Sequence, residues 1–347
     1  MKKVLRLLTV FLIAIAITAC GNKGNSNKTS DAAANDTKSA SGDVIIKIGH
    51  VEPESRSTHK AILNFKKNVE EKSNGKIGIE IYPNGSLGGD VQMTESVAMG
   101  TLQSTLPSTS VLTTYSEEFG ILDMPYLFLN SEAAFKALDG EVGEYFNKKL
   151  EEQGIHCLGY AYNGPRSTTT NSGPIEKPED LKGVKMRVME SPIFIDFYKT
   201  IGANPTPMSF TELYTGLQQG TVDAQENPPS LTFANKFYEV QKYQTIDEHV
   251  HNFLPFLINK NVFDSLDKDM QDLLESEAKV FVAEQREMEL KDNEKAIKDL
   301  EQEGKLITNI LNDDQKSEFK KAIQPMYDKY QKQFGQELFG LCEKYNK

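Results

Sequence analysis

The fold is decided by residues 44–100, VIIKIGHVEPESRSTHKAILNFKKNVEEKSNGKIGIEIYPNGSLGGDVQMTESVAMG. Apolar residues occupy 44–46 and 48 and alternate with other residues over 77–81, which is typical of β-strands. Between these segments, apolar residues recur every three or four positions over 58–73, which predicts an amphipathic helix. Asp90 can cap a second helix. The order strand, helix, strand, helix predicts the α/β class with a largely parallel sheet.

The same alternation continues along the rest of the chain. Strands are predicted at 155–160, 184–188, 222–225 and 253–259. Residues 267–303 contain almost no helix breaker, which predicts one helix of about 37 residues, or roughly 55 Å. A helix of that length is longer than one small lobe is wide, and its heptads are not sustained. It therefore favours a molecule of two lobes, with the helix lying across both.

Two further helix signals lie in the second half of the chain. Ser209 and Glu212 have the spacing of a capping box, in which the hydroxyl and the carboxylate satisfy the first amides of a helix. Residues 313–334 form a last helical stretch that is interrupted near Pro325.

The N-terminus has the pattern of a secretory signal. Basic residues precede an apolar run at 7–19, which is too short to span a hydrocarbon core of ~30 Å. Cys20 follows at once, and Ile-Thr-Ala-Cys at 17–20 resembles a bacterial lipobox. We therefore expect a signal peptide at 1–19 and a lipid on Cys20. The alternative is an ordinary signal peptide that contains a cysteine.

A polar segment follows the signal. Residues 20–42 contain no Ile, Leu, Val or aromatic side chain, so they cannot bury enough apolar surface to offset the entropy of ordering. This composition predicts a flexible tether that holds a folded domain near a membrane. We expect the protein outside the cytoplasm, lipid-anchored in the periplasm or on the outer face of the cytoplasmic membrane.

Charge and cysteine content exclude several classes of protein. The formal net charge is −11, and removing the three cations of the signal makes the mature part −14. Such an acidic chain is a poor candidate for nucleic acid, so any anion must be bound by a local site. Cys157 and Cys342 form no C-x-x-C pair, and they either remain free and buried or pair with each other. No motif predicts a metal or another cofactor.

Three polar stretches lie at or beside predicted strand ends. Arg166 follows a Gly-Pro bend, Arg187 lies on the strand face opposite its apolar neighbours, and Gln225 belongs to an amide-rich turn before two prolines. Ligands of open α/β sheets bind outside the carboxyl ends of strands. Taken singly, each stretch also fits a solvated surface charge or a simple turn.

Together these stretches resemble a known family. YNGPR (162–166), DLKGVKMRV (180–188), GANPTPMSFTELYTGLQQGTVDAQENP (202–228) and KFYEVQKY (236–243) resemble the solute-binding proteins of TRAP (tripartite ATP-independent periplasmic) transporters, in the branch for sugar acids and C4-dicarboxylates. The resemblance covers nearly the whole mature chain. It implies a two-lobed, periplasmic-binding-protein-like clamshell with a long helix spanning both lobes.

The resemblance also implies where the lobes divide. The first lobe is expected to hold 43–163 with about 253–292, and the second to hold 164–252 with about 293–347. A ligand binds between them, and hinge closure brings polar groups of the first lobe onto it.

The same resemblance assigns ligand contacts. It implies that Arg187 pairs with the ligand carboxylate, with Arg166 and Asn227 completing the anchor and Phe210 packing on the ligand. A guanidinium meets a carboxylate through two hydrogen bonds. Two arginines near one site repel each other, which predicts that an empty site prefers the open state.

The first-lobe contacts are less defined by the sequence. Asp90 lies where some relatives contact a polar ligand tail, although a helix cap explains it equally well. His50, Glu52 and Glu54 follow the first strand and can accept ligand hydroxyls. Ser108 stands where sialate binders of the family carry a glutamate, which disfavours sialate.

These features predict a receptor and no enzyme. The expected function is capture of a carboxylate, preferably a sugar acid such as a uronate or an aldonate, by a monomer that delivers it to an ion-gradient-driven TRAP permease. Alternatives are a C4-dicarboxylate ligand, a sensor for a membrane kinase, and a receptor for an ATP-driven importer. A surface hydrolase that uses Glu226 with His249 or His251 is a further alternative, and those two histidines have spacing that suits a metal.

Overall fold

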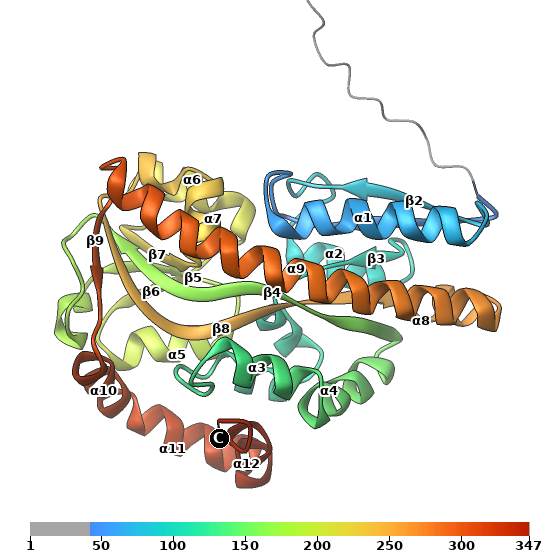
Figure 1. Cartoon of the computed structure of the whole chain (residues 1–347). Coiled ribbons are helices and arrows are strands. Elements are labelled where there is room, and N and C mark those ends of the chain that lie inside the picture. The colour runs from blue at the N-terminus through green and yellow to red at the C-terminus, as the bar shows by residue number, and fades with distance from the viewer. Residues whose placement is uncertain (1–41, 347) are drawn as a thin grey trace, which may run out of the picture. The chain divides into compact units, whose positions relative to one another are not determined.

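Nine strands of the described chain form one mixed sheet (Figure 1). The computed structural model describes residues 42–346. The strand order is β2-β1-β3-β8-β4-β7-β5-β6, with β9 beside β8. The strands are β1 Val44–Gly49, β2 Ile77–Tyr82, β3 Ser104–Thr105, β4 Ile155–Thr170, β5 Lys185–Val188, β6 Asn204–Pro207, β7 Ala224–Asn227, β8 Tyr243–Asn259 and β9 Ile307–Ile310.

Helices cover both faces of this sheet. They are α1 Ser57–Lys72, α2 Asp90–Ala98, α3 Ser131–Leu138, α4 Glu141–Glu151, α5 Pro192–Thr200, α6 Leu213–Gln218, α7 Pro229–Ala234, α8 Lys260–Asp264, α9 Lys268–Gln302, α10 Asp313–Ala322, α11 Gln324–Phe334 and α12 Gln336–Glu343. Short 3₁₀ turns lie at Thr109–Thr114, Glu117–Asp123, Pro178–Leu181, Phe210–Glu212 and Phe237–Glu239.

The two ends of the sheet are parallel and its centre is antiparallel. β1 pairs in parallel with β2 and β3, and β5 pairs in parallel with β6 and β7. Between them β4 and β8 pair with each other in antiparallel fashion. The predicted α/β class is confirmed, and parallel pairing holds at both ends of the sheet, where strand and helix alternate along the chain.

β4 and β8 are much longer than predicted. The sequence indicated strands at 155–160 and 253–259, but the strands have 16 and 17 residues. The register shifts three times, including between Tyr162 and Gly164 and between Arg166 and Thr168. These irregularities break the period-two pattern, and polar residues fill the second half of β4 and the first half of β8. Because both strands cross the whole sheet, the two lobes share it (Figure 1).

The long helix α9 is confirmed almost to the residue. Asp267 caps it, since its carboxylate accepts a hydrogen bond of 2.9 Å from the amide of Met270. The helix packs against α1, β4 and α7, and it crosses the molecule diagonally in Figure 1. Its buried face carries polar side chains, among them Gln285 and Glu289. The helix is therefore joined to both lobes by hydrogen bonds as well as by apolar contact.

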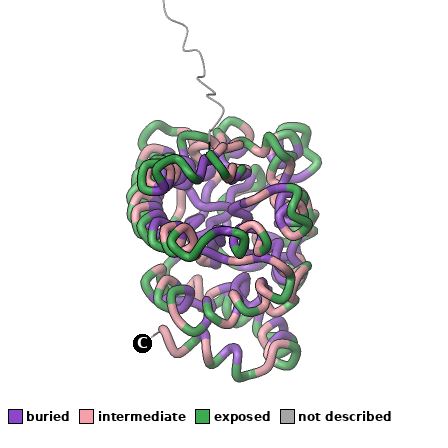
Figure 2. Tube along the Cα trace, turned by 90° about the vertical axis from the view of Figure 1, so that its right-hand side faces the viewer, coloured by how far each residue is buried: buried purple, intermediate pink, exposed green. Residues whose placement is uncertain are grey.

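Two large apolar cores lie in the described part of the chain. One core lies between β1, β2, α1 and α9 and includes Ile48, Phe65 and Phe281. A larger core packs α3, α4 and α5 against β4, β5 and β8 and includes Phe194 and Phe253. Figure 2 shows the buried backbone running through the interior and exposed helices around it. The predicted residue limits of the lobes remain predictions.

Three smaller predictions have clear outcomes. The capping box is wrong, because the Ser209 hydroxyl lies 3.1 Å from Thr211 Oγ1 and a 3₁₀ turn precedes α6. The break near Pro325 is confirmed, since α10 ends and α11 begins there. Cys157 and Cys342 are free and buried. The signal peptide, Cys20 and the tether lie outside the described residues. Within 42–346, no helix has the length and apolar character needed to cross a membrane.

Candidate functional site

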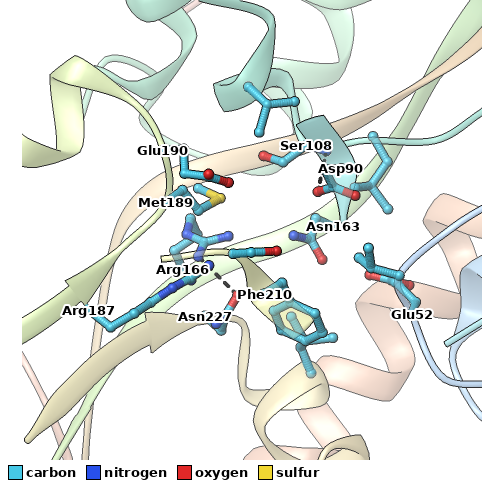
Figure 3. Close-up of a pocket in the computed structure, with 15 residues that line it drawn as sticks. Glu52, Asp90, Ser108, Asn163, Arg166, Arg187, Met189, Glu190, Phe210 and Asn227 are labelled. Carbon is cyan, nitrogen blue, oxygen red and sulfur yellow. Dashed lines mark hydrogen bonds between the residues drawn. The ribbon is translucent and has the colours of Figure 1, made fainter. Parts of the chain in front are cut away.

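A pocket lies where β4 and β8 cross between the two ends of the sheet (Figure 3). Its empty space, including the mouth that is open to solvent, is about 500 Å³. The lining residues come from both lobes and from the crossing strands. They are Val51, Glu52, Asp90, Ser108, Val111, Asn163, Arg166, Arg187, Met189, Glu190, Ser209, Phe210, Asn227, Leu231 and Leu254.

Arg187 presents one free donor to this pocket. Its neighbours Met186 and Val188 are fully buried in the core, so the predicted alternation along β5 turns Arg187 to the other face. Its Nε and Nη2 donate to the carbonyl of Met208 at 3.0 and 2.7 Å. Its Nη1 is buried and has no hydrogen-bond partner. A buried donor without a partner is costly, so this atom is suited to a ligand.

The charge on Arg187 is weakly compensated by the protein. Burial, together with the nearby Arg166, lowers the pKa of the Arg187 guanidinium to about 10, although Glu226 opposes the shift. The side chain therefore remains a cation at neutral pH. An anionic ligand would relieve both its missing hydrogen bond and its uncompensated charge.

Arg166 differs because the protein already neutralises it. Its Nε pairs with Glu226, and its Nη2 donates to Glu226 Oε1 and to Asn227 Oδ1, each at 2.9 Å. Arg166 and Glu226 are both buried. The predicted repulsion between the two arginines is present, since Arg166 lowers the pKa of Arg187, but the negative charge of Glu226 offsets it. The preference of an empty site for the open state remains a prediction. Arg166 still lines the pocket and orders its floor.

A histidine continues this chain of buried charges. His249 Nε2 lies 3.3 Å from Glu226 Oε2, and His249 Nδ1 lies 3.0 Å from Asp247 Oδ2. Although burial opposes it, Asp247 and Glu226 raise the pKa of His249 to about 9. The residues Arg166, Glu226, His249 and Asp247 thus alternate in charge, which lowers the cost of burying each one.

This arrangement weakens the hydrolase alternative. A general base has to be unprotonated near neutral pH, whereas His249 is held as a cation. His251 lies apart from Glu226 and pairs with the Tyr162 hydroxyl at 2.6 Å. Among residues 42–346, no group of three or more His, Cys, Asp or Glu side chains is placed to hold a metal ion.

Asn227 and Phe210 line the pocket, whereas Gln225, which was also expected to contact the ligand, lies outside the lining. The Gln225 amide accepts from Asn227 Nδ2 at 2.6 Å and donates to Thr169 Oγ1 at 2.8 Å. Because Asn227 Oδ1 accepts from Arg166, these contacts fix which end of the Asn227 amide faces which neighbour. Gln225 therefore orients Asn227 from behind the pocket.

Asp90 presents one free acceptor from the opposite wall. It begins α2, and Gly89 is the N-cap, so Asp90 is no cap. Its Oδ2 accepts from the amide of Ser108 at 3.2 Å, while its Oδ1 is buried without a partner. Burial raises the pKa of the Asp90 carboxyl to about 7, with a contribution from Glu52. Figure 3 shows Asp90 and Arg187 on opposite sides of the pocket.

Of the other first-lobe residues expected to contact the ligand, one lines the pocket and two do not. Glu52 lines the pocket and pairs with the guanidinium of Arg56, at 3.3 and 3.4 Å. His50 is buried outside the lining, with its Nε2 3.1 Å from His59 Nδ1, and burial lowers its pKa to about 4. Glu54 is exposed and does not line the pocket.

Sequence reasoning missed Asn163 and Arg56. Asn163 lines the pocket, donates to Asn252 Oδ1 at 2.9 Å and accepts from Arg56 at 3.1 Å. It is three residues before Arg166, so strict alternation puts the two on opposite faces of β4. The register shift between Tyr162 and Gly164 brings both to the pocket. Arg56 follows the first strand by seven residues, and its sequence context resembles an exposed loop.

Comparisons with known proteins agree with this two-lobed ligand-binding architecture. Residues 48–333 match the DctP family, described as bacterial extracellular solute-binding protein, family 7. The chain is 35% identical over 266 residues to the 2,3-diketo-L-gulonate-binding periplasmic protein YiaO of Escherichia coli, covering 76% of this chain and 81% of that protein. It is 32% identical over 343 residues to the C4-dicarboxylate-binding protein DctB of Bacillus subtilis, covering 97% of each.

A solved structure matches equally well. The sugar acid binding protein DctPAm from Advenella mimigardefordensis, in complex with galactonate, superposes with a TM-score of 0.83. It is 34% identical, and the match covers 87% of this chain and 98% of that one. The chain belongs to the DctP family, the extracytoplasmic solute receptors of TRAP transporters. The family and the fold predicted from the sequence are confirmed.

Proposed function

We propose that this receptor binds a sugar acid, such as an aldonate or a uronate, and delivers it to a TRAP permease driven by an ion gradient. One observation carries the proposal. Arg187 Nη1, a donor, and Asp90 Oδ1, an acceptor, are both buried and unpartnered, and the two residues line the same pocket from opposite sides (Figure 3). A ligand with a carboxylate at one end and hydroxyl groups at the other satisfies both atoms.

The two walls have different chemistry. A carboxylate at Arg187 gains charge-assisted hydrogen bonds, each worth roughly 1.5–3 kcal/mol when desolvated. At the other wall, Asp90 and Glu52 offer carboxylate oxygens that accept hydroxyl protons. Contact with both walls favours the closed arrangement of the lobes, since only that arrangement reaches both ends of the ligand.

A C4-dicarboxylate is the second candidate. Its support is the similarity to the Bacillus subtilis C4-dicarboxylate-binding protein over nearly the whole chain. Against it, a second carboxylate would face Asp90 and Glu52, and like charges at close range repel. A sensor for a membrane kinase would use the same pocket and remains an alternative role for the same binding event.

The proposal includes attachment of the receptor to the membrane. Cys20 carries the lipid, residues 20–42 tether the binding domain, and a single copy works at the membrane surface. The support is the lipobox-like run at 17–20 and the polar composition that follows it. The similarity to the Bacillus subtilis protein covers 97% of this chain, so it includes part of the N-terminal segment.

A thermal-shift screen tests the ligand class. The purified protein is refolded from denaturant, which removes any acquired ligand, and is heated with sugar acids, C4-diacids and the matching neutral sugars. A ligand at a hundredfold excess over its Kd adds ~2.7 kcal/mol of stability. We expect an upward shift in Tm with a uronate or an aldonate and none with neutral sugars. A shift with diacids alone would replace the sugar acid by the second candidate.

A further inference from the structure

The carboxyl of Asp90 has two oxygens in different situations. Oδ2 is held by the backbone amide of Ser108, whereas Oδ1 is buried and has no partner, and the residue lines the pocket. When Asp90 is ionised, the pocket therefore presents an acceptor. When Asp90 carries a proton on Oδ1, the same position presents a donor. The Ser108 amide keeps Oδ2 an acceptor in both states.

The charges around Asp90 are known from the structure. Glu52 from the β1–α1 loop and Glu190 after β5 disfavour its ionised form, and Arg187 from β5 favours it. Glu52 has its own cation, because Arg56 donates to both of its carboxylate oxygens. The balance leaves the pKa of the Asp90 carboxyl at about 7, mainly through burial. Both protonation states are therefore within reach near neutral pH.

We propose that the protonation state of Asp90 determines whether the pocket binds a sugar acid or a C4-diacid. The inference rests on the proposed function of this pocket. A sugar acid places a hydroxyl on Oδ1 and binds the ionised form. A C4-diacid places its second carboxylate there, and it binds only when Oδ1 carries a proton that it donates to that carboxylate. Binding of a diacid above neutral pH therefore takes one proton from solution, and binding of a sugar acid takes none.

Two other buried acids could cause proton uptake during closure, and they define the controls. Burial also raises the pKa of Asp123 and of Glu289 to about 7. Neither side chain lines the pocket. Asp123 accepts from the hydroxyls of Ser110 and Ser191 at 2.7 and 2.8 Å, which an asparagine can replace in part. Asp123→Asn is therefore the matched control for Asp90→Asn.

The test measures the number of protons taken up on ligand binding as well as the Kd. Succinate and galactonate are titrated calorimetrically into the refolded full-length receptor at pH 8, in phosphate and in Tris, whose ionisation enthalpies differ. The difference in heat between the buffers gives the number of protons bound. We expect about one proton with succinate and about none with galactonate. The Kd for succinate should rise about tenfold per pH unit above pH 7.5.

The variants identify the group that takes the proton. In Asp90→Asn the Ser108 amide holds the side-chain oxygen, so the NH₂ group faces the pocket as a permanent donor. Succinate should then bind without proton uptake and without pH dependence, and galactonate should bind about tenfold more weakly. In Asp123→Asn the uptake with succinate should persist.

Several results would overturn the inference. One is binding of succinate by the wild type at pH 8 without proton uptake, and another is uptake that persists in Asp90→Asn. A third is failure of succinate to bind at both pH 6 and pH 8 while galactonate binds, since neutral Asp90 should admit the diacid. If neither ligand binds at any pH, the proposed function itself fails, which is a different result from a missing proton.

Discussion

Glu226 accepts hydrogen bonds from both Nε and Nη2 of Arg166, and both side chains are buried beneath the pocket. Arg187 has no such partner, since only the carbonyl of Met208 accepts from it. Two arginines that line one pocket therefore have different roles. Arg166 is part of the protein's own charge balance, and Arg187 holds the charge that a ligand completes.

Arg166→Ala should destabilise the protein strongly. It leaves Glu226 buried without its cation, and breaking a buried ion pair in this way costs about 3–5 kcal/mol. Chemical denaturation without ligand measures the loss. Arg187→Ala is the matched control, since it removes a buried cation that has no acidic partner, and we expect a much smaller change. Equal losses in the two variants would contradict the division of roles.

His249 should make stability depend on pH. Its pKa is about 9 in the folded protein and about 6.5 when unfolded. A raised pKa of this kind contributes stability that is fully present below pH 6.5 and is lost as pH rises through 9. The contribution is of the order of 3 kcal/mol.

His249→Gln, which cannot titrate, isolates this effect. Denaturation curves between pH 7.5 and 9.5 should show a steep loss for the wild type and a flatter profile for the variant. This window avoids the carboxyls of Asp90, Asp123 and Glu289, whose pKa values are about 7. Parallel profiles would show that His249 is not a cation in the folded state.

Gln225→Met should weaken ligand binding without removing a pocket residue. Methionine keeps the volume but loses the amide that orients Asn227, so we expect a rise in Kd of about tenfold. Calorimetry with galactonate measures it. Gln244→Met in β8, which β4 separates from β7, is the matched control, because Gln244 is buried and its amide has no partner. Unchanged binding in Gln225→Met would contradict the orienting role.

Cys20→Ala should release the protein from the membrane while leaving its folded domain able to bind. Cell fractionation with immunoblotting measures the distribution, and calorimetry on the soluble fraction measures binding. Lys28→Ala, a change within the tether, is the control and should leave the protein at the membrane. Retention of the Cys20→Ala protein in the membrane fraction would contradict lipid anchoring through this residue.

The sequence predicted the elements whose signals are local. The helix at 267–303 has a capping aspartate and no breaker, so its limits agree with α9. Arg187 was placed correctly because β5 is short and regular, and period two holds over it. In contrast, the length of β4 could not be predicted, since its polar second half becomes a buried strand only by pairing with β7 and β8.

The neutralisation of Arg166 by an acidic partner could not be predicted from the sequence either. Glu226 is 60 residues from Arg166 along the chain, and only the pairing of β4 with β7 brings them together. For the same reason the free oxygen of Asp90 could not be told from a helix cap. Its role depends on Ser108, which lies 18 residues away and donates its amide to the carboxylate.

Calorimetric titration of galactonate into the refolded wild type and into Arg187→Ala tests directly whether a ligand carboxylate binds Arg187. We predict saturable binding to the wild type, a Kd at least about 100-fold weaker for the variant, and no binding of neutral galactose to either. Similar affinity of the two proteins for galactonate would contradict this prediction, because it would show that the carboxylate does not bind Arg187.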